Sequence, residues 1–172
     1  MRGEQTATRL RLTAVVFTAF ILQVTLFVDV HPLGVAPELA LLVAIHAGRE
    51  GGPDRGAFAG FAAGLLYDLE LGTPLGLWAL TCCLVAYAMG VLTENLHRPT
   101  GIVATVSSGL ASVAGVIFFA VTAALLGEHG MLDGDLLRIA LLVGVVNFAL
   151  SPLMSRALRW AYRPSGAMRA AV

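Results

Sequence analysis

The amino-acid sequence predicts an all-α integral membrane protein with about six transmembrane helices. Of its 172 residues, 58% are hydrophobic and only 13% are charged, and the mean hydropathy is +0.83. Soluble domains carry about 25% charged residues, and a water-soluble fold of this size could not bury so much apolar surface. We therefore expect lipid to cover much of the chain. The apolar residues fall into runs separated by short polar segments, which predicts one polytopic membrane domain over residues 1–172.

Six apolar runs predict the membrane spans. In order, the runs are 12–28, 37–47, 56–69, 75–92, 101–126 and 136–154. A cytoplasmic tail at 155–172 is expected to follow. The helix of the last span is expected to continue into this tail as an interfacial helix to about Tyr162. The first run resembles a signal peptide, but it exceeds the usual apolar core of about 7–15 residues and no small-x-small cleavage site follows. It is expected to be an uncleaved span. Four runs approach the ~20 residues that cross about 30 Å of hydrocarbon. The second and third are short, and either cross as protein-surrounded helices or form a re-entrant hairpin.

The arginines predict the orientation. Ten of the eleven arginines fall on one side of the membrane: before span one, between spans two and three, between spans four and five, or after span six. Arg138 alone falls on the opposite side. Because basic residues concentrate in cytoplasmic loops, both termini are expected in the cytoplasm. Omitting spans two and three would leave Arg49 and Arg55 inside the membrane, which is costly. The sequence therefore favours six spans over four.

Span three carries the sharpest local pattern. Gly56, Gly60, Gly64 and Asp68 recur every four residues and so share one helix face, beside the bulky Phe61. Glycines let another backbone approach closely, which is consistent either with packing inside the chain or with docking of a partner protein's helix. An acidic group at membrane depth is a functional candidate. The nearby turn at 71–74 offers the other interpretation, in which the Asp68 carboxylate binds backbone amides.

The sequence specifies no catalytic, metal-binding or cofactor-binding pattern. Cys82 and Cys83 are adjacent, so they point in different directions on a helix, and no second pair completes a metal site. The small polar residues of span five, including Ser108, suit close helix contacts. No spacing pairs a serine with a histidine, and no phosphate loop or haem motif occurs. The net charge of zero indicates no nucleic-acid partner. We expect a protein that is not an enzyme and carries no cofactor.

Three blocks in the first half of the chain resemble the rod shape-determining MreD family of bacteria. They are Pro37-Glu38-Leu39, the Gly60–Asp68 segment and Pro74-Leu75-Gly76. That family shows a proline followed by Asp or Asn, a Gly-Phe-x-x-Gly-hydrophobic-x-x-Asp helix and a Pro-Leu-Gly turn. The resemblance makes Pro37, Glu38, Pro74 and Gly76 turn or structural positions. Glu38 stands where Asp or Asn is more usual in the family, which weakens any role that depends on the shorter side chain.

The resemblance implies a non-enzymatic membrane scaffold of the bacterial cell-elongation complex. Such proteins reside in the cytoplasmic membrane, bind the bitopic protein MreC, and work with MreB, RodA and a class B penicillin-binding protein in lateral peptidoglycan synthesis and cell shape. Membrane lipid is an expected contact, whereas a small-molecule substrate is not. The implied fold resembles the substrate-binding subunits of energy-coupling-factor transporters.

Two other functions stay open from the sequence. A vitamin-binding transporter subunit shares the implied fold, but such subunits often carry an Ala-x3-Ala pattern in span one, whereas Ala14 and Ala19 are five residues apart. A membrane-embedded hydrolase acting through Ser108 would need a histidine base that the spacing does not supply.

Overall fold

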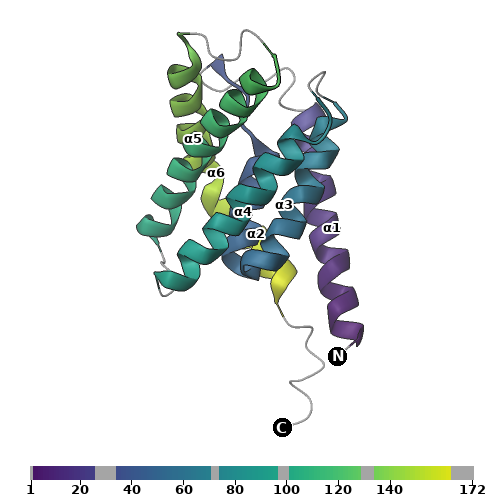
Figure 1. Cartoon of the computed structure of the whole chain (residues 1–172). Coiled ribbons are helices and arrows are strands. Elements are labelled where there is room, and N and C mark those ends of the chain that lie inside the picture. Colours follow the sequence, from purple (N-terminus) through teal and green to yellow (C-terminus); the bar gives the residue numbers. More distant parts are fainter. Residues whose placement is uncertain (1, 26–33, 71–73, 97–100, 129–133, 164–172) are drawn as a thin grey trace.

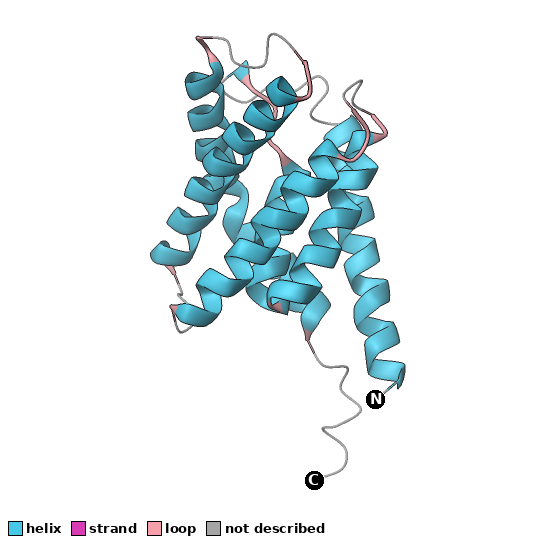
Figure 2. Ribbon diagram, in the orientation of Figure 1, coloured by secondary structure: helices cyan, strands magenta, loops and turns pink. Residues whose placement is uncertain are grey.

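The computed structural model describes residues 2–25, 34–70, 74–96, 101–128 and 134–163, with only the backbone described for residues 2–5. These ranges contain helices and no strand (Figure 2), which confirms the predicted all-α membrane fold. The helices are α1 (Arg2–Thr25), α2 (Leu39–Gly51), α3 (Pro53–Asp68), α4 (Leu77–Asn95), α5 (Ile102–Leu125) and α6 (Leu136–Tyr162). His31, His97, Arg98, His129, Asp133, Arg169 and most of the turn at 71–74 lie outside the described residues.

The six helices run alternately up and down, so that the start of α1 and the end of α6 lie at the same end of the bundle (Figure 1). The junction of α2 and α3 lies at this end too. We call it the arginine-rich end because the nearest parts of these helices carry Arg9, Arg11, Arg49, Arg55, Arg156, Arg159 and Arg163. Arg138 lies near the start of α6, at the opposite end, where an exposed ion pair joins it to Asp135 at 4.0 Å.

Within the described ranges, four helices are long and apolar enough to cross a membrane: α1 from Thr6 onward, α4, α5 and α6. At 1.5 Å per residue, the 13 residues of α2 and the 16 of α3 extend about 20 Å and about 24 Å. Both helices are therefore shorter than a hydrocarbon core of about 30 Å. Nevertheless, every residue of α2 from Leu39 to Gly48 is buried. The other helices surround α2 and take the place that lipid would otherwise occupy.

The connection between α2 and α3 is much shorter than the sequence suggests. The polar stretch 48–55 resembles a loop between two spans, yet α2 continues to Gly51 and α3 begins at Pro53. Gly52 alone joins them, with φ +85°, a left-handed conformation that glycine adopts without steric penalty. Pro53 suits the first turn of α3, where its missing N–H has no helical acceptor to lose.

Helix α6 also extends beyond the predicted span. Hydropathy ends the span at Met154, and the helix expected to continue to about Tyr162 does so: α6 is continuous from Leu136 to Tyr162 although Pro152 lies inside it. Leu158 and Ala161 are completely buried in this extension, and Leu158 packs against Ala47 and Ala59. The arginines of this segment lower its mean hydropathy, but its apolar face still packs against α2 and α3. Residues 164–172 of the predicted tail lie outside the described part.

The core is organised around α2. Leu41, Ala44 and Ile45 pack in one cluster with residues of α3, α4, α5 and α6. Trp78 of α4 lies at its centre, stacked on Phe119 of α5 with 4.4 Å between ring centroids. It also meets Tyr67 of α3 edge-on at 5.6 Å. These aromatic contacts join α3, α4 and α5 at the end of the bundle where Asp68 lies.

Candidate functional site

Asp68, at the end of α3, holds the start of α4. Its Oδ2 accepts hydrogen bonds from the backbone N–H groups of Gly76 and Ala79, and its Oδ1 accepts one from Trp78, all at 3.0 Å. Only 2% of the residue is exposed. The first N–H groups of a helix have no partner within the helix, and a carboxylate there also interacts favourably with the helix dipole. Asp68 therefore caps α4 from a neighbouring helix.

The three glycines of α3 form its contact with α2 and α4. A Cβ at Gly64 would lie 2.5 Å from the carbonyl oxygen of Trp78, and one at Gly60 would lie 2.6 Å from that of Cys82. A Cβ at Gly56 would collide with the backbone of Gly48 in α2. Because backbone atoms of other helices fill this space, the glycine face is covered by the chain itself. A partner's helix cannot occupy the same face while the bundle is intact.

The opposite side of α3 presents an apolar stripe. Phe58, Phe61, Leu65 and Leu69 follow one another at intervals of three or four residues and so lie on one face. Phe58 is 76% exposed, Phe61 44% and Leu69 67%, and Leu65 is half-buried. We call these four residues the α3 outer face. Phe61, which the sequence placed beside the glycines, thus points away from the core.

The start of α2 is held by polar groups from two other helices. Gln23 of α1 accepts a hydrogen bond from the backbone N–H of Leu39 at 2.9 Å. Asn147 of α6 donates to the backbone oxygen of Glu38 at 3.3 Å and to Ser112 at 3.0 Å. The Glu38 side chain is hydrogen-bonded to Tyr67 of α3. Pro37 just before it is fully buried. These contacts fix the buried end of a helix that has no capping side chain of its own.

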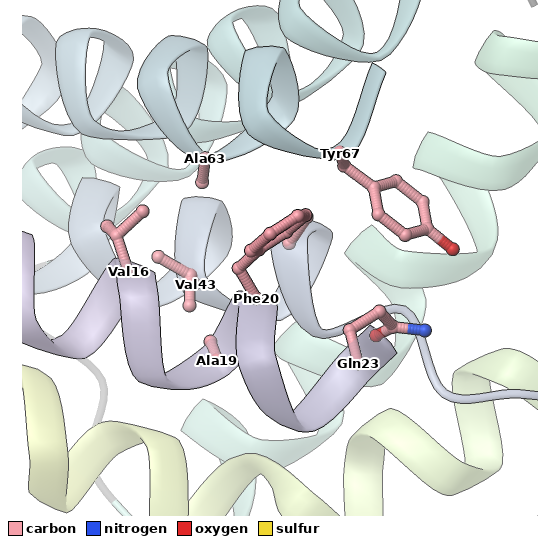
Figure 3. Close-up of a pocket in the computed structure, with 8 residues that line it drawn as sticks. Val16, Ala19, Phe20, Gln23, Val43, Ala63 and Tyr67 are labelled. Atoms are coloured by element: carbon pink, nitrogen blue, oxygen red, sulfur yellow. The ribbon is translucent and has the colours of Figure 1, made fainter. Parts of the chain in front are cut away.

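A small cavity lies beside these groups. Figure 3 shows Val16, Phe20 and Gln23 of α1 on one side of it, and Ala63 and Tyr67 of α3 on the other. Its volume is about 10 Å³, which approaches the space needed by a single water molecule and is far smaller than sites for organic ligands.

The residues singled out by the sequence thus meet at one end of the bundle. Glu38 contacts Tyr67, and Asp68 contacts Gly76, which has φ +99° at the start of α4. The exposed Pro74 accepts a hydrogen bond from the N–H of Leu77 at 3.2 Å. The three sequence blocks are therefore joined by hydrogen bonds that set the relative positions of α2, α3 and α4. Gly56 and Gly60 lie farther along α3, toward the arginine-rich end.

One polar pair was not foreseen from the sequence. His46 Nε2 lies 3.0 Å from Ser151 Oγ, and both residues are buried. The two are 105 positions apart, so no local spacing could indicate the contact. His46 Nδ1 is buried without a hydrogen-bond partner in the described part of the chain, so no acidic group orients the imidazole there. Ser108, the nucleophile of the hydrolase alternative, instead donates to the Ala104 carbonyl at 2.9 Å and accepts from Arg49.

Comparison with known proteins identifies one family. The family model described as rod shape-determining protein MreD matches residues 5–159. Neither a curated protein nor a solved structure matches the chain significantly.

Proposed function

Because the chain belongs to the MreD family of rod shape-determining proteins, we propose that it is a non-enzymatic membrane scaffold of the bacterial cell-elongation complex. In this role it binds MreC and supports lateral peptidoglycan synthesis by RodA and a class B penicillin-binding protein, together with MreB. It resides in the cytoplasmic membrane with all six helices crossing and both termini in the cytoplasm. The clustering of arginines at the end of the bundle that holds both termini supports this orientation.

The family match carries the scaffold role, and the observation that supports a surface for MreC is the α3 outer face. The glycine contacts and the Asp68 hydrogen bonds hold the other side of α3 against α2 and α4, so the four outer side chains form its outward surface. A helix of about 24 Å is short for the bilayer, and short helices are accommodated by local thinning or by association with another protein. We therefore assign the α3 outer face to the membrane helix of MreC.

Replacing Phe58 and Phe61 together by alanine tests this assignment. Membrane helices associate largely through van der Waals packing, and losing both aromatic side chains is expected to weaken MreC binding roughly tenfold, equivalent to about 1.4 kcal/mol. The measurement is the amount of MreC that co-purifies with the tagged protein from detergent-solubilised membranes.

The matched control is Phe118→Ala, which removes an exposed phenylalanine from α5. It should leave MreC recovery unchanged. If the double variant elutes as a monodisperse protein and recovers as much MreC as the unmodified chain, MreC does not bind through the α3 outer face.

Depletion of the protein in its host tests the scaffold role itself. Loss of elongated cell shape, seen by microscopy and reversed by re-expression, is the expected result because the family determines rod shape. Normal shape combined with a vitamin requirement would instead favour the transporter-subunit alternative.

A further inference from the structure

A large cavity opens at the arginine-rich end, away from the α3 outer face. It has a volume of about 740 Å³ and lies among α2, the end of α4, the start of α5 and the second half of α6. Sites for organic ligands commonly have volumes of about 300–1,000 Å³. None of the contacts described for Asp68, Glu38 or the glycine face involves this cavity.

Positive charge dominates its walls. Arg49, Arg156 and Arg159 line the cavity. Among the described residues the single lining carboxylate is that of Glu50, so the described lining carries a net charge of +2 with His46 neutral. Arg49 is attracted by Glu50 and, to a smaller extent, repelled by Arg159. The Arg49 guanidinium is held in place because it donates to the Ala104 carbonyl at 2.6 Å and to Ser108 Oγ at 3.3 Å. An anion between the arginines would offset their repulsion.

A buried polar group lines the same cavity. His46 and Ser151 both contribute to its wall and are hydrogen-bonded to each other. When the Ser151 hydroxyl donates to Nε2, the imidazole carries its proton on Nδ1, which has no acceptor within the described ranges. Buried polar atoms without partners are rare in folded proteins and call for an explanation. His46 is 0% exposed, so its Nδ1 does not open into the cavity, and it is the basic lining that indicates an anionic ligand.

The remaining wall combines the hydroxyl side chains Thr93, Thr105 and Ser155 with an apolar part. Phe148 and Pro152 of α6 and Ile102 of α5 line the cavity, and all three are exposed. Phe148 lies one turn farther from the arginine-rich end than Pro152, so the lining changes from charged to apolar along α6. This polarity matches an amphiphile whose anionic group faces the arginines and whose hydrocarbon chain follows α6.

We propose that this cavity binds the phosphate headgroup of an anionic phospholipid, with Arg49, Arg156 and Arg159 around the phosphate and one acyl chain against Phe148. Basic pockets between transmembrane helices suit such headgroups. The site lies apart from the surface assigned to MreC and does not depend on that assignment.

Lipid binding by the full chain tests the site. The protein is purified in detergent and titrated with phosphatidylglycerol or phosphatidylcholine, and bound lipid is counted by native mass spectrometry. The unmodified chain should bind phosphatidylglycerol preferentially. Arg156→Gln combined with Arg159→Gln should weaken phosphatidylglycerol binding roughly 30-fold, which corresponds to about 2 kcal/mol for two arginines. Both side chains are exposed, so the variant is expected to fold.

The matched control combines Arg9→Gln with Arg55→Gln. These arginines are also exposed and at the same end, but they do not line the cavity, so this variant should retain phosphatidylglycerol binding. Equal losses in the two double variants, or equal binding of the two lipids to the unmodified chain, would overturn the proposal. Millimolar inorganic phosphate forms a further arm of the titration. Occupancy by phosphate with no lipid preference would assign the cavity to a soluble phosphate compound and overturn the lipid assignment.

Discussion

Replacement of Gly64 by alanine is expected to destabilise the protein, although alanine is the better helix former by about 1 kcal/mol. The new Cβ would lie 2.5 Å from the Trp78 carbonyl oxygen and 2.7 Å from the Ala79 Cα. These are backbone atoms of α4, so the clash is relieved only by moving one helix away from the other. Overpacking of this kind costs about 1–3 kcal/mol, and the short distance favours the upper half of that range. Leucine at the same position should prevent folding.

The melting temperature of the purified protein in detergent measures this effect. For a chain of this size, a net loss of about 1–2 kcal/mol lowers the melting temperature by roughly 2–8 °C. Gly134→Ala is the control, since no atom lies within 4 Å of a Cβ built at that position. Its melting temperature should not change measurably. A Gly64→Ala protein as stable as the parent would mean that α3 and α4 are not packed as closely as the structure places them.

Replacement of Asp68 by alanine is expected to cost about 3 kcal/mol or more. The change leaves the N–H groups of Gly76, Trp78 and Ala79 without their acceptor. Each buried donor left unsatisfied costs about 1–3 kcal/mol, although three neighbouring losses do not add fully. Such a variant should be recovered poorly from membranes and should melt at a clearly lower temperature than the parent.

Two further variants define the role of Asp68. Asp68→Asn keeps one acceptor oxygen and should lose less stability than the alanine variant. Glu70→Ala removes an exposed carboxylate two residues away and should be neutral. If Asp68 instead served mainly to bind an ion or a partner, both Asp68 variants would melt like the parent while losing function. That pattern would contradict the capping role derived from the hydrogen bonds.

The glycine variants also bear on how MreC binding should be measured. A substitution at Gly60 or Gly64 forces α3 away from α4 and destabilises the whole bundle. MreC recovery would then fall whichever surface binds MreC. The exposed Phe58 and Phe61 avoid this difficulty because they contribute little to the core. The effect of a substitution on MreC recovery therefore reports on the binding surface only when the substituted residues belong to the α3 outer face.

Much of this architecture follows from local patterns. Apolar runs indicate the helices because membrane helices must satisfy their own backbone hydrogen bonds. The four-residue spacing of Gly56, Gly60 and Gly64 indicates one helix face. The position of Asp68 indicates a carboxylate near backbone amides, and the structure identifies these as amides of Gly76, Trp78 and Ala79 at the start of α4.

Other features depend on distant residues and leave no local signal. The charged stretch around Arg49 resembles a loop, but Arg49 belongs to α2 and its guanidinium donates a hydrogen bond to the Ala104 carbonyl of α5. The pairing of His46 with Ser151 and the basic cavity around them arise only when α2 meets α6. The sequence indicates a helix beyond Met154, but it does not indicate that Leu158 of this helix is completely buried, because average hydropathy does not register a single buried position.

The burial of α2 has a consequence for how the protein is made. A 13-residue helix that carries Arg49 and Glu50 in its last turn and ends at Gly51 is too short to partition into the bilayer on its own. Because Gly52 is the only residue between α2 and α3, the two are expected to enter together as one hairpin, after α1 and before or alongside α4. The glycines of α3 pack against the backbone of α4. The membrane orientation of α2 and α3 would therefore become fixed only once α4 has been synthesised. Membrane integration and tertiary folding of this chain are then a single event.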